Sequence, residues 1–177
     1  LGDPNVGFFR PVEAPYTIIP APPWAPTLEA RVFASIDTLT DGLRRHLGDM
    51  AYLVHAQDCI AARAATRLRT EGRPLTVVRT VHHVDDFSTH ALIECQQRSI
   101  TEPDHVLVVS RHWQEALARD FGIEATVVPN GVDAHRFASP GEVPPAALRE
   151  RAGLSEEFVF LTVGGLEPRK GSLELIE

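Results

Sequence analysis

This sequence has few cysteines, no long hydrophobic run and no excess of positive charge. The 177 residues include only two cysteines, Cys59 and Cys95, too few for a disulfide framework. This usage suits a reducing compartment, so we expect a cytoplasmic protein. The apolar runs, such as 106–109, fall far short of the roughly 20 residues that span a bilayer. Asp and Glu outnumber Lys and Arg by 24 to 17, which argues against a partner nucleic acid.

Several motifs with well-defined chemistry are also missing. The cysteines do not form a Cys-x-x-Cys redox pair, and no His-x-x-x-His pair is present to bind a metal from one helix face. Near the end, Lys170 precedes Gly171, whereas a Walker A sequence needs lysine after glycine. Arg169 and Lys170 at the start of a predicted helix nevertheless suit a diphosphate, through their charges and the helix dipole.

The residues that are present divide the chain into four parts. Seven of the fourteen prolines lie within residues 1–26, so we expect an extended segment whose aromatic side chains pack onto the body. Residues 27–139 form the main domain, and 140–155 form a linker that holds a short helix. Residues 156–177 begin a second α/β domain, with a strand at 158–163.

Helical and strand-like patterns alternate throughout the main domain. Apolar residues recur at helical spacing in four segments: 28–47, 59–69, 89–100 and 113–121. Short apolar runs indicate four strands: 51–55, 75–81, 105–109 and 125–128. Strands of this kind are apolar on both faces, so the sequence predicts an α/β fold in which helices cover each side of a parallel sheet.

Polar side chains gather where the predicted strands end. Parallel sheets bind ligands outside the carboxyl ends of their strands, because loops and helix N-termini meet there. The residues at these positions, strand by strand, are His55, Gln57 and Asp58; His82, His83, Asp85 and Asp86; Ser110, Arg111 and His112; and Asn130 and Asp133. The sequence therefore predicts a cluster of titratable groups at one edge of the sheet.

Each of these residues also has an ordinary structural interpretation. Asp58 and Ser110 precede predicted helices, where both residue types are common N-caps, and His55 fits a satisfied structural histidine. Imidazole and carboxylate groups also suit Zn, Mn or Fe, although loop spacing fixes no coordination geometry. A metal-dependent hydrolase is therefore a competing hypothesis, based on His82, His83, Asp85 and Asp86.

Short phrases in a particular order connect these positions to a known family. They are His-Ala-Gln-Asp at 55–58, Thr-Val-His at 80–82, Val-Val-Ser at 108–110, Pro-Asn-Gly-Val-Asp at 129–133, and Val-Gly-Gly-Leu at 163–166 with Lys170-Gly171. In this order they resemble glycosyltransferase family four. The resemblance spans essentially the whole chain and is greatest to an actinobacterial-type subgroup with Arg-Thr-Val-His-His-Val-Asp-Asp-Phe, here 79–87.

The resemblance implies a retaining enzyme of the GT-B arrangement, with two Rossmann-like domains across a cleft. The N-terminal domain receives the acceptor, and the other domain binds the nucleotide sugar. His82 matches the family histidine beside the reacting carbon, and Asp58 matches an acidic position near the sugar or acceptor. Lys170, with Arg169 and Gly165, matches the donor diphosphate site, so we expect no metal and no cofactor. The remaining acceptor-side or sugar-side candidates are His55, His83, Asp85, Asp86, Ser110 and Asn130.

Departures from the family pattern leave further hypotheses open. Gly165 stands where the family usually has Arg, and the Glu-x7-Glu element of the C-terminal domain is absent. The first strand and glycine-rich loop of the N-terminal domain would precede Leu1, so we expect an incomplete chain without turnover of its own. One such hypothesis is a non-catalytic carbohydrate- or nucleotide-binding module, and another is a nucleotide-sugar epimerase.

The expected partners follow from the same resemblance. They are a nucleotide-sugar donor and a carbohydrate, lipid or small-molecule acceptor. Peripheral membrane contact is common among relatives, although no basic amphipathic surface stands out in this sequence.

Overall fold

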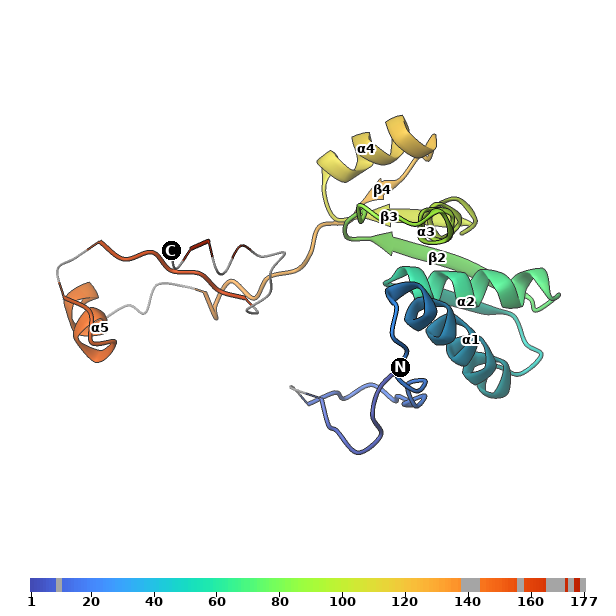
Figure 1. Ribbon diagram of the computed structural model, residues 1–177, viewed down its shortest axis with the longest axis horizontal. Coiled ribbons are helices and arrows are strands. Elements are labelled where there is room, and N and C mark those ends of the chain that lie inside the picture. The colour runs from blue at the N-terminus through green and yellow to red at the C-terminus, as the bar shows by residue number, and fades with distance from the viewer. Residues whose placement is uncertain (9–10, 138–143, 156–157, 165–170, 172–173, 176–177) are drawn as a thin grey trace. The chain divides into compact units, whose positions relative to one another are not determined.

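The structure is a computed structural model that describes residues 1–8, 11–137, 144–155, 158–164, 171 and 174–175 (Figure 1). The chain divides into two compact units, Leu1–Gly131 and Val132–Glu177. The domain boundaries predicted at 139 and 155 lie beside or within stretches that are not described, 138–143 and 156–157, and they stay predictions.

Unit 1 contains a four-stranded sheet whose strands are all parallel and follow one another in chain order. The strands are β1 (Tyr52–Ala56), β2 (Leu75–Val81), β3 (His105–Val108) and β4 (Thr126–Val127). In the register of the sheet, Tyr52 lies opposite Leu75, and Val78 lies opposite His105. The predicted Rossmann-like α/β fold is confirmed.

Four helices of unit 1 begin and end close to their predicted positions. They are α1 (Leu28–His46), α2 (Cys59–Thr70), α3 (His90–Thr101) and α4 (Arg111–Phe121). Local chemistry explains their ends. The hydroxyl of Thr27 accepts a hydrogen bond of 3.1 Å from the Ala30 amide at the start of α1. At the end of α4, Gly122 adopts the left-handed backbone with φ 66°, which glycine allows without strain. No helix in the described parts of the chain is long and apolar enough to cross a membrane.

The helices of unit 1 pack against one face of the sheet. The strands lie in the sheet in the order in which they occur in the chain, and connections between parallel strands are right-handed. The helices α2, α3 and α4 therefore lie on the same side of the sheet. Their apolar side chains meet those of alternate strand residues there: Leu68 packs with Val77, and Leu117 packs with Val108. On the other face Leu53 is 69% exposed, and no helix covers it within the described residues. The sequence pattern predicted helices on both faces, and the described part of the chain has them on one.

The proline-rich N-terminal segment contacts α1. Ile19 is buried, and its side chain lies where a Cβ on Gly42 would otherwise be, so a glycine is needed at this point of α1. The segment is also bonded to itself, because the Gly2 amide donates to the Ile19 carbonyl and the Ala21 amide donates to the Gly2 carbonyl, each at 3.1 Å. Several of its aromatic side chains stay exposed, including Trp24 at 77%.

Unit 2 contains the short helix α5 (Pro145–Arg151). The guanidinium of Arg149 donates to the Ser155 carbonyl just beyond the helix. The strand predicted at 158–163 is wrong: the structure has no strand there, and Leu161 is 85% exposed. An apolar run becomes a strand only when another strand offers it a hydrogen-bonding edge, and the described residues of unit 2 contain none.

Candidate functional site

The polar residues predicted at the strand ends share one edge of the sheet, because all four strands run in the same direction. His55 is the last residue but one of β1, with Gln57 and Asp58 shortly after it, and His82 follows β2. Ser110 follows β3, and Asn130 follows β4. A single edge therefore carries side chains from four separate stretches of the sequence.

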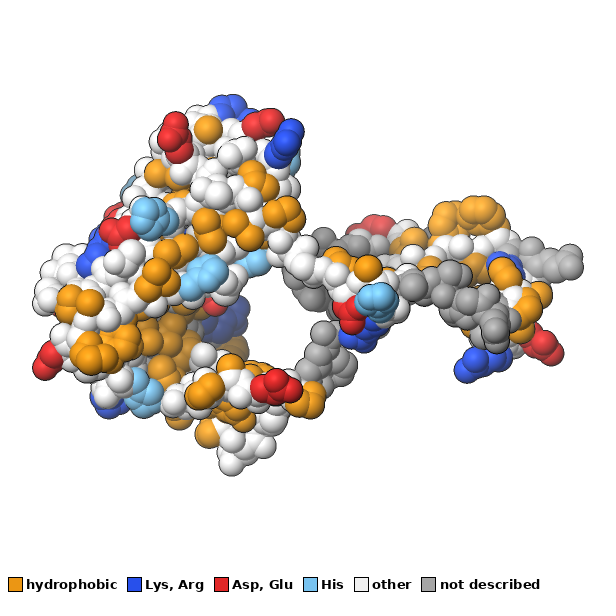
Figure 2. Space-filling model, turned by 180° about the vertical axis from the view of Figure 1, so that it is seen from behind, with side chains coloured by type: hydrophobic (Ala, Val, Ile, Leu, Met, Phe, Trp, Pro, Cys, Tyr) orange, Lys and Arg blue, Asp and Glu red, His pale blue; other side chains and the backbone are white. Residues whose placement is uncertain are grey.

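Within this edge, four side chains form one continuous hydrogen-bonded chain, which we call the His–Gln–His chain. Nε2 of His82 lies 3.0 Å from Oε1 of Gln57, and Nε2 of Gln57 lies 3.1 Å from Nε2 of His55. The same His55 nitrogen lies 2.8 Å from Oγ1 of Thr80. Strand alternation places His55 and Thr80 on the sheet face opposite the helices. On the face of the molecule in Figure 2, histidine side chains lie among hydrophobic ones.

The loop that follows His82 is held in place by α3. The Asp85 amide donates to Oε1 of Gln96, and Nε2 of Gln96 donates back to the Asp85 carbonyl, both at 2.8 Å. His83 and Asp85 also approach each other, with Nε2 3.5 Å from Oδ1. These contacts give the loop a defined path, in which Val84 packs against the core while His83, Asp85 and Asp86 are exposed.

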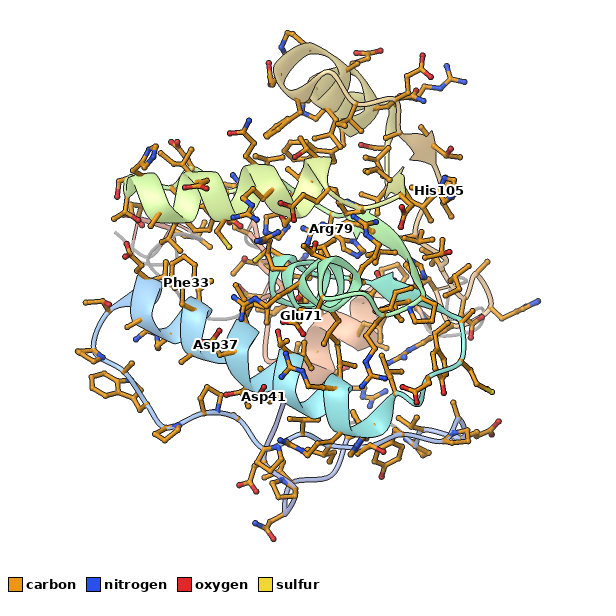
Figure 3. The ribbon with its side chains drawn as sticks, turned by 90° about the vertical axis from the view of Figure 1, so that its right-hand side faces the viewer. Phe33, Asp37, Asp41, Glu71, Arg79 and His105 are labelled. Carbon is orange, nitrogen blue, oxygen red and sulfur yellow. The ribbon has the colours of Figure 1, made fainter. Side chains whose placement is uncertain are left out.

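A buried arginine lies under the same edge, on the helix side of the sheet. Arg79 of β2 is 6% exposed, and Figure 3 shows it between α2 and α3. Within the described residues, its Nε and Nη1 atoms have no hydrogen-bond partner. Burial lowers the pKa of this guanidinium, while nearby groups, among them Asp58 and Asp85, act in the opposite direction. Arg79 thus places a positive charge beneath the loops that follow β1 and β2.

Asp58 acts as the N-cap of α2. Its Oδ1 accepts a hydrogen bond of 2.7 Å from the Ala61 amide. Asp58 and His82 follow neighbouring strands, but no hydrogen bond joins them in the described structure, and the carboxylate is directed to the helix instead. The structural interpretation of Asp58 therefore holds, and any role toward a ligand would come in addition to it.

We expect Asp58→Ala to lower the free energy of unfolding by about 1 kcal/mol, because the first amides of α2 lose their acceptor. Asp58→Asn keeps an oxygen at the same position and should cost only a few tenths of that amount. Urea unfolding followed by circular dichroism measures both values. Equal losses in the two variants would show that the charge, and not the cap, matters for stability.

The remaining predicted residues have separate surroundings. Oγ of Ser110 lies 3.4 Å from the Trp113 amide and caps α4. Asp86 lines a cavity of about 450 Å³ between the start of α1 and the loop before α3, together with Phe87 and Thr89. Asn130 is exposed. The residues predicted to hold a diphosphate, Gly165, Arg169 and Lys170, lie outside the described residues.

The described residues give the metal hypothesis no geometric support. Within the described ranges, no group of three or more His, Cys, Asp or Glu side chains converges as metal ligands would. Of the four residues in that hypothesis, His83 and Asp85 form the one close pair that the described structure shows.

Three residues of this region were not among the predicted edge residues: Arg79, Thr80 and Gln96. Gln57 was placed at that edge but was given no role at the site. Gln57 stands at the end of a predicted strand, but a neutral amide does not titrate and gives no chemical signal of its own. Arg79 can be recognised in the sequence, because a charged residue inside an apolar strand is unusual. Thr80 lies in the Thr-Val-His phrase at 80–82, but nothing in the phrase indicates that its hydroxyl contacts His55. Gln96 has no sequence signal, because its partner Asp85 comes from a distant loop.

The fold defines an α/β domain of the Rossmann-like kind, with its polar residues at the carboxyl edge of the sheet, where parallel sheets bind ligands. The family model described as Glycosyltransferase Family 4 matches residues 3–136. The match covers most of the chain and all of its sheet, so the chain belongs to glycosyltransferase family 4.

Two curated relatives are similar to parts of this chain. One is the GDP-mannose-dependent alpha-(1-6)-phosphatidylinositol monomannoside mannosyltransferase of Mycolicibacterium smegmatis, 40% identical over 61% of this chain and 29% of the relative. The second is the putative teichuronic acid biosynthesis glycosyltransferase TuaC of Bacillus subtilis, 27% identical over 71% of this chain and 33% of the relative. The chain thus aligns with about a third of the length of these relatives.

Proposed function

We propose that the full-length protein transfers a sugar from a nucleotide-diphosphate sugar to an acceptor with retention of the anomeric configuration, in the cytoplasm. The observation that carries this proposal is the His–Gln–His chain at the carboxyl edge of a family 4 domain. The His–Gln–His chain holds His82 at the carboxyl edge of the sheet. In the arrangement that the family resemblance implies, a sugar hydroxyl binds at this place. Unit 1 is then the acceptor-side half of the enzyme.

The chemistry of the transfer suits these side chains. Breaking the bond between sugar and diphosphate leaves negative charge on the phosphate oxygens and positive character on the anomeric carbon. His82 contacts the sugar hydroxyls beside that carbon and holds them in place, while the leaving phosphate helps to remove the acceptor proton. Lys170, Arg169 and Gly165 are proposed for the diphosphate from their positions in the sequence alone.

The donor proposed for the first test is GDP-mannose. The relative with 40% identity is named as dependent on GDP-mannose and as a mannosyltransferase acting on a phosphatidylinositol mannoside. By analogy we propose a glycolipid or carbohydrate acceptor. Contact with a membrane surface would follow from a lipid acceptor and is part of the same proposal.

The test is an assay of the full-length protein with GDP-mannose, with UDP-glucose as the comparison donor, and with mannosylated phosphatidylinositol as acceptor. We expect a glycolipid product whose new linkage has the donor's α configuration by ¹H NMR. Residues 1–177 alone should give no turnover. Tight binding of nucleotide sugar without any product would instead favour a non-catalytic binding module, and an epimerised nucleotide sugar would favour an epimerase.

A further inference from the structure

Gln57 lies between two imidazole rings and contacts both with its two different amide atoms. The amide oxygen faces Nε2 of His82 at 3.0 Å, and the amide nitrogen faces Nε2 of His55 at 3.1 Å. Gln57 follows β1 and His82 follows β2, so the amide bridges neighbouring strands at the edge of the sheet. The residue is exposed, and its contacts hold no core together.

The two ends of an amide are not interchangeable, and this sets the protons on both rings. In the amide orientation that the structure gives Gln57, the oxygen faces His82 and can only accept, which assigns the hydrogen to Nε2 of His82. An amide NH₂ only donates, so Nε2 of His55 must be unprotonated, and neutral His55 then carries its hydrogen on Nδ1. The Thr80 hydroxyl lies 2.8 Å from the same His55 nitrogen and, because a hydroxyl can donate or accept, it fits either tautomer of that ring.

The proton on Nε2 determines the state of the other ring nitrogen of His82, Nδ1. With Nε2 protonated, neutral His82 presents an unprotonated Nδ1, and no hydrogen-bond partner of Nδ1 is present among the described residues. A free lone pair at this point accepts a hydrogen bond from a sugar hydroxyl. Without Gln57, a ring at the end of a strand can turn and exchange its two nitrogens.

We propose that Gln57 is a positioning residue: its amide joins His55 to His82 and fixes the ring and tautomer of His82 so that Nδ1 faces the substrate as an acceptor. The functional part of this inference rests on the glycosyl transfer proposed above. The proton assignment does not, because it follows from the hydrogen bonds alone. The two parts are therefore tested separately.

The proton assignment is tested by ¹⁵N NMR of histidine-labelled protein at about pH 8, a pH at which free imidazole is neutral. His55→Asn and His82→Asn assign the two rings. We expect His82 to be protonated on Nε2 and His55 on Nδ1. In Gln57→Met, which keeps the length of the side chain, both rings should populate a mixture of tautomers.

Gln57→Glu separates the two ends of the amide. Its carboxylate still accepts from Nε2 of His82, so His82 should keep its tautomer, but it cannot donate to His55, which should change to the Nε2-protonated form. Gln97→Met, at an exposed glutamine of α3, is the matched control and should change neither ring. The inference is overturned if Gln57→Met leaves both rings as in the parent protein, or if His82 is protonated on Nδ1 in the parent.

The functional part is tested by the kinetics of the full-length protein. Gln57→Met should lower kcat/KM for transfer about fivefold, the effect of one lost hydrogen bond, and Gln57→Glu should recover most of it at pH 8. Unchanged kinetics in Gln57→Met beside altered tautomers would overturn the positioning role. Absence of transfer by the parent protein would instead count against the proposed function and leave the NMR result standing.

Discussion

His82→Ala in the full-length protein is expected to lower kcat/KM for sugar transfer by about 100-fold, the size of effect seen when one polar contact to the reacting centre is removed. His82 is half-buried and directly follows β2. Within the described residues, its single hydrogen-bond partner is Gln57. In the proposed function the substitution removes a contact to the sugar, and it removes little that stabilises the fold. Steady-state assays with saturating acceptor and varied donor measure the effect.

A matched control comes from the opposite edge of the sheet. His105 begins β3 and is exposed, so it lies at the amino end of a strand and not at the carboxyl edge (Figure 3). His105→Ala should leave transfer within about twofold of the parent protein, and thermal unfolding should be similar for both variants. Normal transfer by His82→Ala, or an equal loss in both variants, would remove His82 from the site.

Leu68→Ala is expected to lower the free energy of unfolding by about 3 kcal/mol. Leu68 is fully buried on α2 and packs with Leu75 and Val77 of β2, so truncation costs the transfer of its methyl groups and leaves a cavity. Urea unfolding followed by circular dichroism measures the change. With a slope of about 2 kcal/mol per molar urea, the midpoint should fall by about 1.5 M.

Leu53→Ala is the control for this second prediction. Leu53 belongs to β1, but it is 69% exposed on the face that no described helix covers. Its truncation should change the free energy of unfolding by less than about 0.5 kcal/mol. A cost at Leu53 as large as the one at Leu68 would show that this face is covered in solution by something else.

Most elements of unit 1 were predictable because their patterns are local. β2 was predicted to the residue, since an apolar β-branched run stands between Pro74 and polar residues, and α1 and α4 have caps at Thr27 and Gly122 that can be read directly. The polar edge was also predictable. Once strands are parallel, the residues that follow them must share one edge.

The errors came from features that depend on distant neighbours. The run at 158–163 has the composition of a strand, yet pairing needs a second strand, which the described residues of unit 2 do not provide. The cover on both sheet faces was inferred from apolar strands. Because the strands follow one another in chain order and their connections are right-handed, α2, α3 and α4 lie on one side of the sheet.

The order of residues was sufficient to indicate the α/β class, the family and the presence of His55, His82 and Asp58 at one rim. Only the tertiary structure decided which of them touch. It directs Asp58 into a helix cap and inserts Gln57 between two histidines that are far apart along the chain. The reason is physical: a hydrogen bond depends on angles and on separations of about 3 Å, and register between strands, which no local pattern encodes, sets both.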